Sequence, residues 1–168
     1  MILSGGWEYS NGDLQNVMGV LGEKQIYAKQ HLVIFGEYIP FQEWIPLKPI
    51  VEFTGFKAGD GLQVFETPEG LRYSPLVCYE IIFPGKTIAR GSAPDFIVNV
   101  TNDAWYGDSA GPHQHLVQST FRAIETGIPV IRVANTGFSS LINAMGAEEY
   151  RSDLFIQHSQ TLRLPRKI

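Results

Sequence analysis

The chain has 168 residues, 44% of them hydrophobic and 18% charged, which is ordinary for a globular protein and enough for one domain with a core. Thirteen basic and seventeen acidic side chains give a formal net charge of -4, and basic residues cluster only in the short stretch 163–167. We therefore expect no nucleic-acid partner. The single cysteine, Cys78, excludes an internal disulfide and a multi-cysteine zinc site.

No segment has the pattern of a targeting signal or a membrane helix. The first residues, MILSGGWEYSNGD, lack the basic start and the apolar stretch of a secretory signal. Apolar runs such as 81–83 and 96–98 have the length of strands, whereas a membrane helix needs roughly 20 residues. We therefore expect a soluble chain as written, with a single domain over residues 1–168, because repeats and low-complexity linkers are absent.

The first third of the chain predicts a β-meander followed by an irregular segment. Turn residues between apolar stretches predict three short strands, at 1–4, 16–21 and 25–28. Residues 29–38 have neither helical nor strand periodicity and predict a loop, and loops on a rigid scaffold often carry functional sites. Residues 41–57 contain two prolines and several aromatic side chains, which indicates an irregular, partly exposed apolar segment.

The rest of the chain alternates predicted strands and helices. Strands are predicted at 62–65, 71–77, 95–100, 129–134 and 138–142, and helical segments at 87–90 and 111–126. The longer helix rests on apolar residues near the helical period, namely Leu116, Val117, Phe121 and Ile124, and Gly127 ends it. The tail, 150–164, alternates weakly and is expected to end in an edge strand. This order predicts an α/β protein with a mixed sheet.

Cys78 is the first candidate for chemistry because it lies where a predicted strand ends. A thiol at the carboxyl end of a strand faces the crevice in which open α/β sheets bind ligands. The backbone N–H of Tyr79 is then close enough to stabilise an oxyanion. The alternative interpretation is that Cys78 is a small buried hydrophobic residue, which is a common role for a free cysteine.

Lys29 and two glutamates are the candidate partners of this thiol. A nearby ammonium group lowers the pKa of a thiol and offers a hydrogen bond to developing negative charge, and Lys29 can do both. A carboxylate such as Glu37 or Glu80 can keep that lysine charged and oriented. The alternative is that Lys29 and Glu37 are solvated surface charges.

A metal site and a serine hydrolase site are less favoured by the sequence. His113 and His115, with Asp103 or Asp108, contain metal-ligand types, but two residues two positions apart on a helix point to different faces. Ser109 has no G-x-S-x-G surrounding. We expect no metal and no cofactor, and we expect Asp108 or Ser109 to cap the following helix.

Four separated strings resemble the carbon–nitrogen hydrolase (nitrilase) superfamily, and most closely its apolipoprotein N-acyltransferase branch: YAKQHLVIFGEYIPF, VCYEIIFP, NVTNDAWYGDSAGPHQH and FRAIETGIPVIRVANTG. They follow the family's order, and the resemblance covers nearly the whole chain. Amidases and nitrilases share the lysine and cysteine positions. The CYE context and the TNDAWYGDSAGPHQH string point to the acyltransferases.

The resemblance implies an αββα sandwich with a Glu-Lys-Cys triad. Cys78 matches the nucleophile and Lys29 the triad lysine. The other matches are Glu37 as an additional active-site glutamate, Glu80 as a supporting carboxylate, and Tyr79 and Trp105 as neighbours that shape the site. The implied reaction moves an acyl chain from a phospholipid to the cysteine as a thioester, and then to the amino-terminal amine of an apolipoprotein. The implied location is the bacterial inner membrane, with the domain on the periplasmic side.

Two features of the family have no match in this sequence. The family's triad glutamate lies upstream of SGGWEYSNGD, and its membrane helices lie outside the matched strings. We therefore expect a partial domain, truncated at its N-terminal side, with little or no activity as an isolated chain of 168 residues and with an exposed sheet edge.

Two other functions remain open at this point. One is a soluble amidase or nitrilase that hydrolyses a C–N bond, and the other is an inactive fragment. The aromatic residues between 35 and 56 predict either local packing or a lipid-facing lid. These residues are Phe35, Tyr38, Phe41, Trp44, Phe53 and Phe56.

Overall fold

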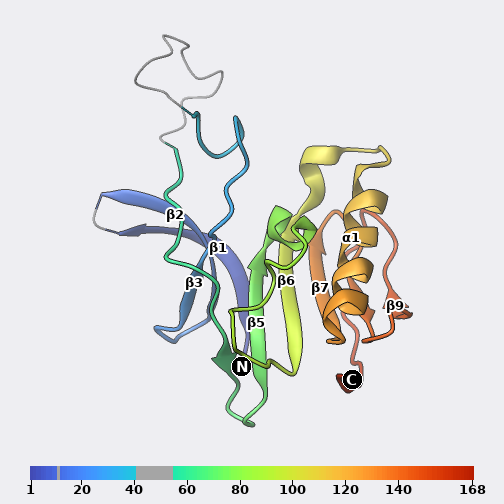
Figure 1. Ribbon diagram of the computed structural model, residues 1–168. Helices are drawn as coiled ribbons and strands as arrows, with labels where there is room; N and C mark the ends of the chain where they lie inside the picture. Colours follow the sequence, from blue (N-terminus) through green and yellow to red (C-terminus); the bar gives the residue numbers. More distant parts are fainter. Residues whose placement is uncertain (11, 41–54) are drawn as a thin grey trace.

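The computed structural model describes residues 1–10, 12–40 and 55–168. These residues form two β-sheets and one long helix, arranged as three layers (Figure 1). The smaller sheet packs on one side of the larger sheet, and helix α1 (Gly111–Thr126) packs on the other. The α/β class is confirmed.

The smaller sheet is the predicted β-meander. Its antiparallel strands are β1 (Leu3–Ser10), β2 (Asp13–Val20) and β3 (Ile26–Ala28). Strands β1 and β2 are longer than predicted, because the polar and glycine-rich residues of β1 pair in register with β2 as far as Ser10 opposite Asp13. Backbone pairing of this kind leaves no hydrophobic signal in the sequence.

The larger sheet has six strands in the order of the chain. They are β4 (Phe65–Glu66), β5 (Arg72–Val77), β6 (Phe96–Asn102), β7 (Val130–Asn135), β8 (Ser140–Ile142) and β9 (Glu148–Arg151). The central strands β5, β6 and β7 are parallel and the outer pairings are antiparallel, so the predicted mixed sheet is confirmed. Helix α1 connects β6 to β7 and ends at Gly127 with a φ of 65°, as predicted.

Apolar side chains cover both faces of the larger sheet. Ile97 belongs to the cluster under α1, together with Leu116 and Val130. Its neighbour Val98 belongs to the cluster between the sheets, together with Met18. Successive strand residues point to opposite faces, so β6 needs a continuous apolar run to fill both clusters.

Two short predicted elements are wrong. Residues 87–90 are not helical: Thr87 is buried, and its carbonyl accepts a hydrogen bond from the Ser74 hydroxyl at 2.6 Å. A 3-10 helix, η1 (Cys78–Ile82), precedes this segment instead. The edge strand expected in the tail is β9, which ends at Arg151, and the residues after it form no strand. Ser152 is still tied to the segment before β8, because its hydroxyl accepts a hydrogen bond from the Ser139 N–H at 2.9 Å.

The face of α1 that packs on the sheet differs from the predicted apolar face. Val117, Phe121 and Ile124 are exposed, although Leu116 is buried as expected. The buried face carries polar residues, His115, Ser119 and Arg122 among them. Apolar periodicity therefore located the helix without identifying its buried side.

The aromatic segment is only partly described. Phe35 is exposed, whereas Phe56 is buried and its ring lies 6.2 Å from that of Trp7, as the local-packing alternative predicts for Phe56. Phe41, Trp44 and Phe53 lie outside the described residues. None of the helices in the described part of the chain has both the length and the apolar character needed to cross a membrane.

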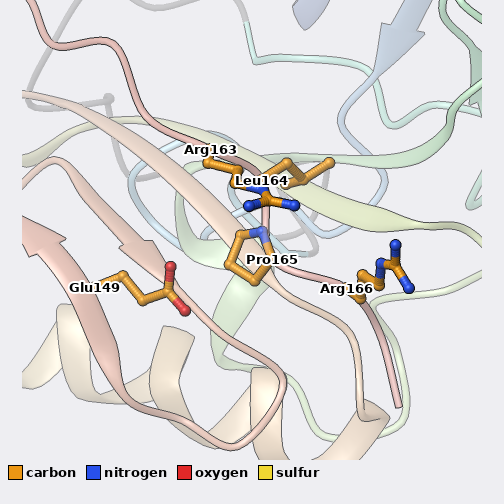
Figure 2. A pocket seen from close by; sticks show the side chains of 5 residues that line it. All are labelled: Glu149, Arg163, Leu164, Pro165 and Arg166. Carbon is orange, nitrogen blue, oxygen red and sulfur yellow. The ribbon is translucent and has the colours of Figure 1, made fainter.

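A surface hollow of about 380 Å³ lies between the tail and β9 (Figure 2). It is lined by Glu149, Arg163, Leu164, Pro165 and Arg166. The three charged residues of this lining are solvent-exposed, and none of the predicted site residues lines the hollow. It is a solvated groove separate from Cys78.

Candidate active site

Cys78 lies at the turn from β5 into η1, as the sequence predicted. Its φ is 53°, a left-handed conformation that costs a non-glycine residue about 1–3 kcal/mol. The Asn99 side-chain amide donates a hydrogen bond to the Cys78 carbonyl at 3.1 Å. The side chain is partly exposed, so Cys78 is not a sealed core residue.

Lys29 follows β3 and is almost completely buried, so it is not a solvated surface charge. Its backbone is held on both sides: its N–H donates to the Asn16 carbonyl and its carbonyl accepts from the Gly59 N–H, each at 2.8 Å. Its ammonium group donates to both carboxylate oxygens of Glu37, at 2.8 and 2.7 Å. The structure therefore brings these two predicted site residues together.

Glu37 is further fixed from two sides. Its Oε1 accepts a hydrogen bond from the Asn16 side chain at 3.1 Å, and its Oε2 accepts one from the Val33 N–H at 2.7 Å. Three groups thus share one carboxylate, which holds the Lys29 ammonium in a single position.

Glu80 is completely buried and joins the lysine segment to the cysteine segment. Its Oε1 accepts hydrogen bonds from the Tyr27 hydroxyl at 2.9 Å and from the Gln30 and His31 N–H groups at 2.7 and 3.1 Å. Its Oε2 accepts a bond from the Val77 N–H at 2.8 Å. Burial raises the pKa of Glu80, and these four hydrogen bonds act in the opposite direction.

The consequence of the Glu80 contacts is that two loops meet. The donors Gln30 and His31 directly follow Lys29, and Val77 directly precedes Cys78. The chain after β3 also rises at the same end of the molecule as the carboxyl ends of β5 and β6 (Figure 1). The segments that carry Lys29 and Cys78 are thereby joined through Glu80. An ammonium group, a thiol and two carboxylates are the residue types that nucleophilic acyl transfer uses.

The two predicted site-shaping residues differ in their surroundings. Tyr79 is partly buried, and its ring packs edge-on against Phe83 with centroids 5.7 Å apart. Trp105 lies on the 3-10 helix η2 (Asp103–Tyr106) and is 87% exposed. The next residue, Tyr106, is half-buried: burial raises its pKa, and the charge of the neighbouring Cys78 raises it further.

A buried polar network behind Cys78 was missed by sequence reasoning. It consists of Asn99, Asp103, His115 and Arg132. Two of these residues had a signal, because Asn99 and Arg132 interrupt runs of apolar residues in predicted buried strands. A polar residue in such a run is informative, since it must be paired when it is buried.

The two histidines of the helix point to different faces, as expected. His113 is exposed against the Phe138 ring, whereas His115 is buried against Asp103.

The expected helix cap is wrong. The N-cap of α1 is Ala110, which makes no side-chain cap, rather than Asp108 or Ser109. The Ser109 hydroxyl, one residue earlier, accepts a hydrogen bond from the Gly111 N–H at 3.1 Å and so satisfies one free donor at the helix start.

The sequence is similar to a family model and to curated proteins. The family model for carbon–nitrogen hydrolases matches residues 5–159. An apolipoprotein N-acyltransferase of Rhizobium rhizogenes is 47% identical over 122 residues, which are 70% of this chain and 23% of that protein. One from Rickettsia prowazekii is 46% identical over 121 residues, 71% of this chain and 24% of that protein. The chain thus spans about a quarter of the length of these curated relatives.

Solved structures agree on the fold. A CN-hydrolase superfamily protein from Xanthomonas campestris has a TM-score of 0.66 at 20% identity, covering 92% of this chain and 59% of that one. The glutamine-dependent NAD+ synthetase from Acinetobacter baumannii has a TM-score of 0.65 at 16% identity, covering 93% of this chain and 30% of that one. Since the family model also matches most of the sequence, the chain belongs to the carbon–nitrogen hydrolase family.

Proposed function

We propose that this chain carries the nucleophile of an apolipoprotein N-acyltransferase, which takes an acyl chain from a phospholipid and delivers it to the amino terminus of an apolipoprotein. The observation that carries the proposal is the connection of Lys29 and Cys78 through Glu80, in a chain 46–47% identical to proteins of that name. Cys78, Lys29, Glu37 and Glu80 are the proposed catalytic and supporting residues.

The first proposed step is attack of the Cys78 thiolate on the ester carbonyl of the phospholipid. A C–S bond forms, the ester C–O bond breaks, and the leaving alkoxide takes a proton, which produces a lysophospholipid and a thioester on Cys78. The Lys29 ammonium and the Tyr79 N–H are the proposed donors to the oxyanion that develops between these states.

The second proposed step is attack of the apolipoprotein amine on this thioester. A C–N bond forms, the C–S bond breaks, the amine loses its proton, and the thiolate of Cys78 is regenerated. Glu37 keeps the Lys29 ammonium oriented through both steps, because it binds the ammonium with two hydrogen bonds.

We further propose that residues 1–168 form one partial domain of a longer protein. In support, the chain spans about a quarter of the relatives' length. The glutamate that acts as general base, and the segments that hold the enzyme at the periplasmic side of the inner membrane, are then supplied by the rest of the protein.

The test uses the full protein that contains these residues, with phosphatidylethanolamine as donor and a diacylglyceryl peptide as acceptor. We expect a thioester on Cys78, detected by mass spectrometry and released by hydroxylamine, and its loss in Cys78→Ser. Ser109→Ala is the matched control and should still form the thioester. Acylation of Cys78 by butyramide but not by phospholipid would overturn the proposal in favour of an amidase, and no adduct from either would indicate an inactive protein.

A further inference from the structure

A buried network of side chains links the nucleophile's backbone to the centre of the larger sheet. On β6, the Asn99 amide nitrogen donates to the carbonyls of Cys78 and Leu76, at 3.1 and 3.3 Å. The Asn99 carbonyl oxygen accepts a hydrogen bond from Arg132 Nη1 on β7 at 2.7 Å. Asn99 and Arg132 are opposite each other in the parallel pairing of the two strands, so the sheet itself sets this contact.

Arg132 is in turn held by three further contacts. Its Nη2 donates to Asp103 at 2.7 Å and lies 3.0 Å from His115 Nδ1, and its Nε donates to the Phe138 carbonyl at 3.2 Å. Asp103 also lies 2.9 Å from His115 Nδ1. Burial on its own would raise the pKa of Asp103, but the hydrogen bond from His115 and the charge of Arg132 outweigh it and lower that pKa. Asp103 is therefore ionised, and Arg132 is a paired, charged guanidinium.

Arg132 is the positively charged member of this buried network. Burial lowers the pKa of Arg132, while the negative charge of Asp103 and its hydrogen bond raise it. The other ionisable groups facing this region are His115, Tyr79 and Tyr106, and burial lowers the pKa of His115 and raises that of Tyr106.

A purely structural role for the network is the simpler interpretation, but it explains less. Replacing a buried ion pair by apolar residues is often neutral or stabilising, so stability alone does not require these residues. The network also ends on the carbonyl of Cys78, which is the one residue of η1 with a left-handed backbone. Such a conformation persists only when the surrounding structure holds it.

We propose that Asn99 and Arg132 are positioning residues for Cys78: Asn99 fixes the carbonyl of the nucleophile residue, and Arg132 orients Asn99. This inference rests on the proposed role of Cys78 as nucleophile.

The test measures alkylation of the chain's single thiol by iodoacetamide as a function of pH, with intact mass as the readout. For Arg132→Met and for Asn99→Ser we expect an about tenfold lower maximal rate of alkylation, because the backbone of Cys78 is no longer held in one position. Arg122→Met is the matched control: Arg122 is a buried arginine on α1 that donates to the Ile82 carbonyl, outside the network, and this variant should keep the wild-type profile.

The outcomes separate positioning from structure. A folded Arg132→Met protein with the wild-type profile would overturn the inference. If that variant does not fold, Arg132→Lys is the second test. It keeps the positive charge but lacks the planar guanidinium that binds several partners at once, so we expect a reduced maximal rate of alkylation with the wild-type midpoint of the pH profile. An unchanged maximal rate in both Arg132→Lys and Asn99→Ser would then overturn it. A reduced maximal rate in the variants of a protein that never forms the phospholipid-derived thioester would refute the proposed function but not the positioning of the thiol.

Discussion

The Glu80 carboxylate accepts the backbone N–H of Gln30 at 2.7 Å, across 50 positions of sequence. Gln30 follows Lys29, and Glu80 lies two residues after Cys78. One hydrogen bond therefore links the segment that follows β3 and carries Lys29 to the segment that follows β5 and carries Cys78, although the two strands belong to different sheets. The same carboxylate accepts three other hydrogen bonds, which makes it a fixed point between the two loops.

Replacing Glu80 should therefore loosen the site and the fold together. Glu80→Ala leaves four donors without a partner, and an unsatisfied buried donor costs about 1–3 kcal/mol. Glu80→Gln should be milder, because an amide oxygen at the Oε1 position keeps three bonds and the amide nitrogen opposes only the Val77 N–H. The measurement is the free energy of unfolding in urea. Glu69→Gln, an exposed residue of the β4–β5 turn, is the control and should change little; equal losses for Glu80→Ala and Glu80→Gln would contradict this account.

Lys29 and Glu37 should behave as one unit. Each single variant, Lys29→Met or Glu37→Gln, removes one partner of a largely buried ion pair, and breaking such a pair costs about 3–5 kcal/mol. The double variant should cost less than the sum, with a coupling energy of about 1–3 kcal/mol. Urea unfolding of the four proteins provides the cycle, and additive losses would show that the contact contributes nothing.

Gly137 should not tolerate a side chain. A Cβ at this position would lie 2.7 Å from Asp103 Cγ, and Asp103 cannot move away because Arg132 and His115 bind it. We expect Gly137→Ala to lower the melting temperature and to destabilise the fold by about 1–3 kcal/mol. Gly6→Ala is the matched control, since a Cβ there meets no atom within 4 Å, and it should stay within about 0.5 kcal/mol of the wild type. Similar losses in both variants would contradict the proposed clash.

His115 should make the stability depend on pH. Burial lowers its pKa in the folded state, so the unfolded chain binds more protons below about pH 6.5. The stability that the neutral imidazole contributes is therefore present above that pH and falls as the pH decreases. In urea unfolding between about pH 7.5 and 5.5, His115→Gln should show a shallower slope than the wild type. The exposed His113→Gln should keep the wild-type slope, and identical slopes for all three proteins would refute the prediction.

Local signals predicted much of the fold. The helix 111–126 and its stop at Gly127 were correct because helical periodicity and a left-handed glycine are properties of adjacent residues. The parallel central strands were visible as continuous apolar runs. Segments that depend on distant partners were missed. In residues 87–90, the Thr87 carbonyl is bound by the distant Ser74 hydroxyl. The polar half of β1 is a strand because it pairs with β2.

The sequence by itself determined the types of the candidate residues and the strand end that carries Cys78, because a motif and its spacing are encoded locally. Only the tertiary structure decided that Lys29 is buried against Glu37, that Glu80 joins the two loops, and that Asn99 binds the Cys78 carbonyl and is itself bound by Arg132. These contacts link residues between 8 and 50 positions apart, and strand pairing and packing between sheets bring them together. No local pattern contains that information.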